Sequence, residues 1–193
     1  MSKSPGEQAQ AFAGAIWGPA LVGLRGSGKS ALAPRVAARL GLDWLDADAE
    51  LERREGRRVA EIFAQEGPAG FRRRERSLLI EDLLQRERLV LATGGGAVLD
   101  AEVRACLAER VTIWLDAPLA VLAERIAGSD RPSLTGQPIV EELGTLRAQR
   151  EPLYRAVASL VLDTASADPD TLAERIAEHW RTTRRAGRPV VLG

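Results

Sequence analysis

Cysteine and histidine are almost absent from this sequence of 193 residues, which contains one of each, Cys106 and His179. A lone cysteine can form no intramolecular disulfide, and there is no cysteine cluster to hold zinc. A histidine metal site or a serine-histidine-aspartate triad would depend on His179 alone. Because His179 lies in a late helix-like stretch, a half-exposed helix position is the simpler interpretation.

Net charge is absent too, because 27 Lys and Arg residues balance 27 Asp and Glu residues. This balance argues against a nucleic-acid binder that works through a generally basic surface. No run approaches the roughly 18 apolar residues that span a bilayer, and the apolar stretch 11–24 is interrupted by Pro19 and lacks the basic start of a signal peptide. We therefore expect a cytoplasmic protein with no nucleic-acid or membrane partner.

Short apolar runs alternate with amphipathic stretches along the chain. The pattern predicts strands at 19–24, 42–48, 88–96, 110–118 and 159–164, and helices at 28–41, 49–56, 59–67, 68–87, 119–128, 140–158 and 169–183. Alternating strands and helices indicate an α/β protein with a parallel sheet covered by helices on both faces. We expect a disordered leader at 1–15, a single domain at 16–182 and a tail at 183–193.

Lysine is also scarce, since Lys3 and Lys29 stand beside 25 arginines. Lys29 belongs to GLRGSGKS, residues 23–30, which fits the phosphate-loop pattern G-x-x-x-x-G-K-[ST] between a predicted strand and a predicted helix. The glycines let backbone N–H groups surround phosphate oxygens, the lysine reaches the β- and γ-phosphates, and Ser30 ligates Mg²⁺. A compact ammonium kept in an arginine-rich chain favours a nucleotide site over an incidental glycine-rich turn.

Two acids, Asp46 and Asp48, end the second predicted strand. With period-two alternation they point to one side, at the edge where ligands bind in open α/β sheets. One could support Mg²⁺ and the other could orient a hydroxyl acceptor, although Asp48 could equally cap a helix that begins near Ala49. Asp116, which ends the apolar run VTIWLD, is a rival for the magnesium-side carboxylate, and the pattern does not decide between them.

A glycine triplet and three arginines complete the candidate site. Gly94, Gly95 and Gly96 follow a strand and suggest close approach of the backbone to a ligand, with a plain flexible turn as the alternative. Arg72, Arg131 and Arg150 lie where a clamp for a carboxylate or phosphate could be built. Because the chain has 25 arginines, no single arginine by itself indicates a binding site.

Six stretches of the sequence resemble, in their order along the chain, motifs of the shikimate kinase family, which are small P-loop kinases of the nucleoside-monophosphate-kinase-like fold. The stretches are GLRGSGKS, DAD, GFRRRE, ATGGG, RPSLTG and QREPLYR. RPSLTG is similar to the RP-[ST]-LTG lid of one branch. The resemblance implies a monomeric three-layer α/β sandwich with a five-stranded parallel sheet and a mobile lid at about 128–140. It also implies transfer of the ATP γ-phosphoryl group to the 3-hydroxyl of shikimate, with Mg²⁺, in aromatic amino-acid biosynthesis.

The resemblance also implies roles for individual residues. The ATP side comprises Gly26, Ser27, Gly28, Lys29, Ser30, Ala31, Arg125 near adenine, and the lid residue Arg131, and the stretch 164–169 aligns with the adenine-side loop. Ser30 and Asp46 are implied at Mg²⁺. The shikimate side comprises Asp48 at the hydroxyls, Gly94, Gly95 and Gly96, and the carboxylate-binding Arg72 and Arg150. Lys29, Asp48 and Arg131 are the implied catalytic residues.

Two positions depart from the family pattern. Ala31 replaces a threonine whose hydroxyl commonly contacts the α-phosphate, and Pro34 removes a backbone donor inside the following helix, so we expect a mild kink and weaker nucleotide binding.

Two other functions stay open. The first is another small-molecule P-loop kinase, of gluconate or nucleoside-monophosphate type, although aromatic residues for base stacking make up only 4% of the chain. The second is a non-catalytic shikimate-sensing regulatory domain, for which residues 1–19 are too short to supply a helix-turn-helix.

Overall fold

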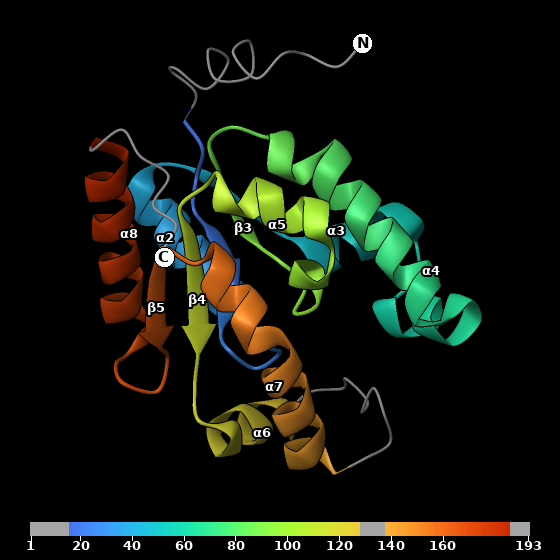
Figure 1. The fold of residues 1–193 in the computed structure, drawn as a ribbon. Helices are drawn as coiled ribbons and strands as arrows, with labels where there is room; N and C mark the ends of the chain where they lie inside the picture. Colours follow the sequence, from blue (N-terminus) through green and yellow to red (C-terminus); the bar gives the residue numbers. More distant parts are fainter. Residues whose placement is uncertain (1–15, 128–137, 186–193) are drawn as a thin grey trace.

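The computed structural model describes residues 16–127 and 138–185. Its centre is a sheet of five parallel strands, β1 (Ala20–Val22), β2 (Asp43–Asp46), β3 (Leu89–Ala92), β4 (Thr112–Asp116) and β5 (Leu160–Asp163). The order across the sheet is β2-β3-β1-β4-β5. The predicted α/β class and the five-stranded parallel sheet are confirmed (Figure 1).

Helices cover both faces of the sheet, as the alternating pattern predicts. Helices α2 (Lys29–Leu40) and α8 (Pro169–Arg185) lie side by side on one face (Figure 1). The other face carries α3 (Ala47–Glu55), α4 (Val59–Glu81), α5 (Ala101–Ala108) and α7 (Ile139–Val157), and α6 (Leu119–Ala127) packs against α7. Helix α5 and the short 3-10 turns Leu83–Gln85 and Ala97–Leu99 were not predicted from the sequence.

The central strand β1 supplies side chains to both layers because successive residues of a strand point to opposite faces. Leu21 packs with α2 and α8, whereas Ala20 and Val22 pack with the helices of the other face. All three residues are fully buried. Burial on both faces explains why the run around β1 is continuously apolar and does not alternate with polar residues.

Glycines mark three predicted breaks in the helices. Gly41 ends α2 and Gly56 ends α3, each in the left-handed conformation that favours glycine. Gly67 interrupts α4 with φ 66° and ψ −179°, followed by Pro68, so the two predicted helices on either side of it meet at a kink. Pro34 lies inside α2, which continues from Lys29 to Leu40.

The predicted site residues lie at the carboxyl ends of the strands. Strands β2 and β3 lie on one side of β1, and β4 and β5 lie on the other, so the connections leave β1 and β3 in opposite directions. Ligands of open α/β sheets bind at such a switch point. The phosphate loop follows β1 and the glycine triplet follows β3, and these strands are paired neighbours.

The expected leader at 1–15, nearly all of the expected lid and most of the tail lie outside the described residues. Among the helices that are described, none combines the length and apolar character needed to cross a membrane.

Candidate active site

The phosphate loop adopts a conformation that only glycine permits at several points. Gly23, Gly26 and Gly28 all have positive φ, at 143°, 79° and 91°. A Cβ on Gly26 would lie 2.9 Å from the carbonyl oxygen of Leu122 in α6, so the loop is also pressed against a neighbouring helix. Gly28 caps α2 without a side-chain hydrogen bond, which leaves this helix N-terminus directed at the loop.

Lys29 is buried at the start of α2, and its ammonium group faces back into the loop. Nζ donates to the carbonyl oxygens of Gly23 and Leu24, both at 2.8 Å, and to Oγ of Ser27 at 3.3 Å. An ammonium carries three donors on a flexible stem, which suits three acceptors around one curled loop better than a planar guanidinium does. The geometry therefore gives a physical reason for a lysine here.

Ser30 and Asp46, the two residues predicted at Mg²⁺, are in direct contact. Ser30 Oγ donates to Asp46 Oδ2. The other oxygen, Oδ1, accepts from the backbone N–H groups of Asp48 at 2.9 Å and Ala49 at 3.2 Å, so Asp46 is the N-cap of α3. The first turn of α2 and the end of β2 thus present a hydroxyl and a carboxylate at one point.

Asp48 differs from expectation in two respects. Strand β2 ends at Asp46, so Asp48 belongs to the first turn of α3 and does not follow strand alternation. The alternative that Asp48 caps this helix is wrong, because Asp46 does so. The half-buried Asp48 lies against the glycine triplet, with Oδ1 3.0 Å from the position that a Cβ on Gly94 would take.

The glycine triplet leaves space for side chains of the site. None of its three residues has positive φ. A Cβ on Gly94 would overlap a carboxylate oxygen of Glu75, and one on Gly96 would overlap the guanidinium of Arg72. A Cβ on Gly95 would lie between the backbone of the phosphate loop, 3.3 Å from Gly23 O, and the guanidinium of Arg150, 3.7 Å from Nη1. Glycine is needed here because side chains approach closely.

Arg72 and Arg150 approach the triplet from α4 and α7, and they are close enough for the charge of Arg72 to lower the pKa of Arg150. Burial is the larger cause of that lowered pKa, because a charged guanidinium loses its hydration. Arg72 forms an ion pair with Glu75, while Nε of the buried Arg150 has no hydrogen-bond partner among the described residues. The two predicted clamp arginines therefore converge on one place.

Glu75 and Tyr154 also belong to this cluster, although neither was predicted as a site residue from the sequence. Burial raises the pKa of the Glu75 carboxyl group, with the charge of Arg72 opposing the effect, and raises the pKa of Tyr154 to about 12. The Tyr154 hydroxyl donates to the carbonyl oxygen of Gly95. The signals were present in the quoted motifs, because Glu75 follows Arg72 by three residues and Tyr154 ends the run PLY.

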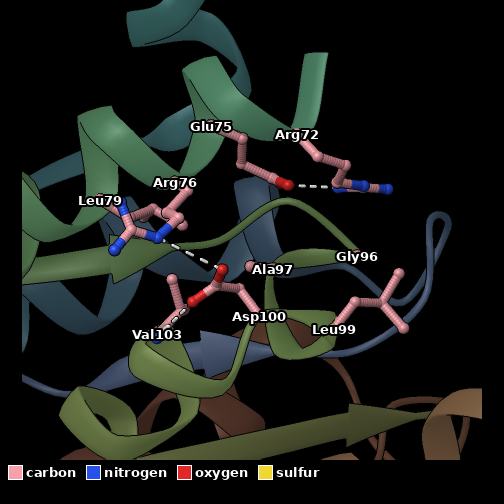
Figure 2. A pocket seen from close by; sticks show the side chains of 9 residues that line it. All are labelled: Arg72, Glu75, Arg76, Leu79, Gly96, Ala97, Leu99, Asp100 and Val103. Atoms are coloured by element: carbon pink, nitrogen blue, oxygen red, sulfur yellow. Dashed lines mark hydrogen bonds and ion pairs between the residues drawn. The ribbon is translucent and has the colours of Figure 1, made fainter. Parts of the chain in front are cut away.

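A cavity of about 170 Å³ opens beside the cluster, between α4 and α5. Figure 2 shows the ion pair of Arg72 and Glu75 at one end of it and a second pair, Arg76 with Asp100, at the other. Its remaining lining is Leu79, Gly96, Ala97, Leu99 and Val103. The cavity thus adjoins the acceptor side of the predicted site and not the phosphate loop.

Arg125 links the phosphate loop to the loop after β5. Its guanidinium donates to Thr164 Oγ1 at 2.8 Å, to Thr164 O at 3.0 Å and to Gly26 O at 3.3 Å. Thr164 opens the stretch 164–169, which the resemblance assigns to the adenine side. Arg131, the predicted lid arginine, lies outside the described residues.

Asp116, the rival of Asp46, has a different environment. Its carboxylate forms an ion pair with Arg147 of α7, and burial raises the pKa of the carboxyl group. Asp116 is thus held by a cation of α7, whereas Asp46 contacts Ser30 of the phosphate loop, so the two rival carboxylates have different partners.

Comparison with known proteins accounts for this arrangement. A sequence profile described as shikimate kinase matches residues 25–181. The chain belongs to the shikimate kinase family. A shikimate kinase from Aromatoleum aromaticum is 41% identical over 158 residues, which are 81% of this chain and 90% of that protein. One from Thermobifida fusca is 39% identical over 159 residues, 82% of this chain and 91% of that protein.

A solved structure agrees with the sequence comparison. The shikimate kinase from Acinetobacter baumannii in complex with shikimate superposes with a TM-score of 0.82 at 35% identity, covering 91% of this chain and 98% of that one. The family membership and the P-loop kinase fold predicted from the motifs are confirmed. The chain is accordingly an enzyme, an ATP-dependent kinase of the shikimate kinase family.

Proposed function

We propose that this chain transfers the γ-phosphoryl group of ATP to the 3-hydroxyl of shikimate, giving shikimate 3-phosphate and ADP. The observation that carries the proposal is the convergence of Asp48, Arg72 and Arg150 on the glycine triplet, beside the phosphate loop. Paired guanidinium groups fit a carboxylate, and a nearby carboxylate fits the hydroxyls of a polyhydroxylated acid. The Acinetobacter baumannii relative has shikimate bound, which supports this acceptor.

On the donor side, the N–H groups at the start of α2 and the ammonium of Lys29 are placed to bind the phosphates of ATP. Arg125 fixes the phosphate loop against the loop at 164–169, the proposed adenine side. Binding requires the ammonium to exchange some of its contacts with loop carbonyl oxygens for phosphate oxygens. Ala31, exposed in the first turn of α2, offers no hydroxyl to the nucleotide.

The oxygen groups of Ser30 and Asp46 fit Mg²⁺, which is a hard cation that prefers oxygen ligands. The described residues contain no group of three or more His, Cys, Asp or Glu side chains arranged for a metal ion. This agrees with Mg²⁺ sites that use one or two protein oxygens together with water and phosphate. When bound, the ion would neutralise charge on the phosphate oxygens.

On the acceptor side, Arg72 and Arg150 would hold the ring by its carboxylate, and Glu75 would keep Arg72 in place through their ion pair. Asp48 would orient the 3-hydroxyl and accept its proton as the oxygen attacks the γ-phosphorus. The bond from that phosphorus to the bridging oxygen breaks, and ADP leaves with the electron pair. Lys29 and the lid residue Arg131 would stabilise the charge that develops.

A coupled ADP-release assay with shikimate, gluconate and a nucleoside monophosphate in parallel tests the proposal. Of the three acceptors, only shikimate is expected to give ADP release. Turnover with gluconate or a nucleoside monophosphate in its place would assign a different acceptor. Binding of shikimate without any release of ADP would favour the sensor instead.

A further inference from the structure

Arg25 lies in the phosphate loop but forms an ion pair far along the chain. Its guanidinium binds the carboxylate of Glu142, 117 residues away, in the first turn of α7. The Glu142 side chain is 0% exposed and that of Arg25 is 13% exposed. A buried carboxylate loses its hydration, so it is tolerated only while a cation stays in place beside it. The pair therefore ties the phosphate loop to the beginning of α7.

The backbone of Arg25 contacts the acceptor side as well. A Cβ on Gly95 would lie 3.5 Å from Arg25 N, which shows how closely the phosphate loop and the glycine triplet pack. Helix α7 reaches the same triplet near its other end, because the Tyr154 hydroxyl donates to Gly95 O and Arg150 lies beside Gly95. Helix α7 thus contacts the phosphate loop through Glu142 and the glycine triplet through Arg150 and Tyr154.

We propose that Arg25 and Glu142 form a positioning pair that sets α7, and with it the acceptor arginine Arg150, at a fixed distance from the phosphate loop. This inference rests on the proposed function, because it assumes that the loop holds the donor and Arg150 the acceptor. Phosphoryl transfer depends mainly on alignment, and a misplacement of about 1 Å can cost about 100-fold in rate. The pair acts through the position of other groups, so its loss slows turnover more than it weakens binding.

The test compares steady-state kinetics of Arg25→Met, Glu142→Gln and the double variant with those of the full wild-type chain. Each single variant is expected to lower kcat by at least about tenfold, with each KM changed by less than about threefold. The double variant is expected to be no slower than the worse single variant, because both changes remove the same contact. The matched control is Glu50→Gln, since Glu50 is also a buried carboxylate but pairs with Arg53 and Arg54 of its own helix.

A second measurement needs no turnover. Binding of ADP is expected to slow amide hydrogen exchange in residues 142–146 of the wild type, because an ordered phosphate loop holds α7 through the pair, and Glu142→Gln is expected to lose this effect. An unchanged kcat, an equal fall in Glu50→Gln, strictly additive losses in the double variant, or the absence of ADP-dependent protection would each overturn the positioning role. A wild-type chain that shows this protection but does not phosphorylate shikimate would leave the coupling in place and refute the proposed function.

Discussion

The guanidinium of Arg150 offers the sharpest test of the acceptor site. Its residue is 7% exposed on α7, and its Nε has no partner among the described residues, so donor capacity remains for a ligand. A hydrogen bond to a charged group contributes about 1.5–3 kcal/mol, so replacing Arg150 with alanine should raise the KM for shikimate by about 10- to 150-fold. The KM for ATP should stay within about threefold, because Arg150 lies beside the glycine triplet, on the proposed acceptor side.

The same assay carries its own control. Arg150→Lys keeps a positive charge but loses the planar fork, so it should give an intermediate KM for shikimate. The Arg150→Ala chain should fold, because removing one of two neighbouring guanidinium groups relieves their mutual repulsion; its thermal unfolding is measured alongside. An unchanged shikimate KM in a folded Arg150→Ala protein would remove this residue from the carboxylate clamp.

Three other changes probe the site and the fold. Asp48→Asn should lower kcat by at least about 100-fold in the ADP-release assay while the unfolding temperature stays close to that of the wild type, because the amide cannot accept the proton, and retention of full kcat would exclude this role. Gly96→Ala should raise the shikimate KM by about tenfold with little loss of stability, since the new Cβ displaces the flexible end of Arg72; an unfolded variant would show instead that the backbone cannot adjust. Burial lowers the pKa of His179 in the folded state below its usual 6.5. The contribution of His179 to folding stability is therefore fully present above pH 6.5 and is lost as the pH falls through the lowered pKa. The free energy of unfolding should therefore drop from pH 7.5 to 5.5 by more in the wild type than in His179→Gln, and equal drops in urea titrations would contradict this.

The phosphate loop and the five strands could be predicted because their signals are local. Glycine at positions 23, 26 and 28 is dictated by the backbone angles of the loop itself, and the apolar runs of β1, β3 and β4 are dictated by burial on both faces. The order of the motifs along the chain was enough to indicate the family. Helix α5 was not predicted because its eight residues show only a weak apolar stripe between two short polar segments.

The acceptor site could be predicted only through the resemblance. With 25 arginines in the chain, nothing local distinguishes Arg72 and Arg150 from surface residues, and their convergence depends on how α4 and α7 cross the glycine triplet. The choice of helix cap is a smaller case of the same kind. Asp46 and Asp48 are chemically identical, and the end of pairing between β2 and β3 decides which one caps α3 and which one faces Gly94.

By itself, the sequence determined the five strands, most of the helices, their order and the phosphate loop, because each follows from interactions among residues close together in the chain. Only the tertiary structure decided which charges meet. Glu75 joins the acceptor arginines through burial beneath the glycine triplet, and Arg25 meets Glu142 across 117 residues. A pairing of buried charges depends on which surfaces the folded helices present to each other, and no local pattern of residue types encodes that.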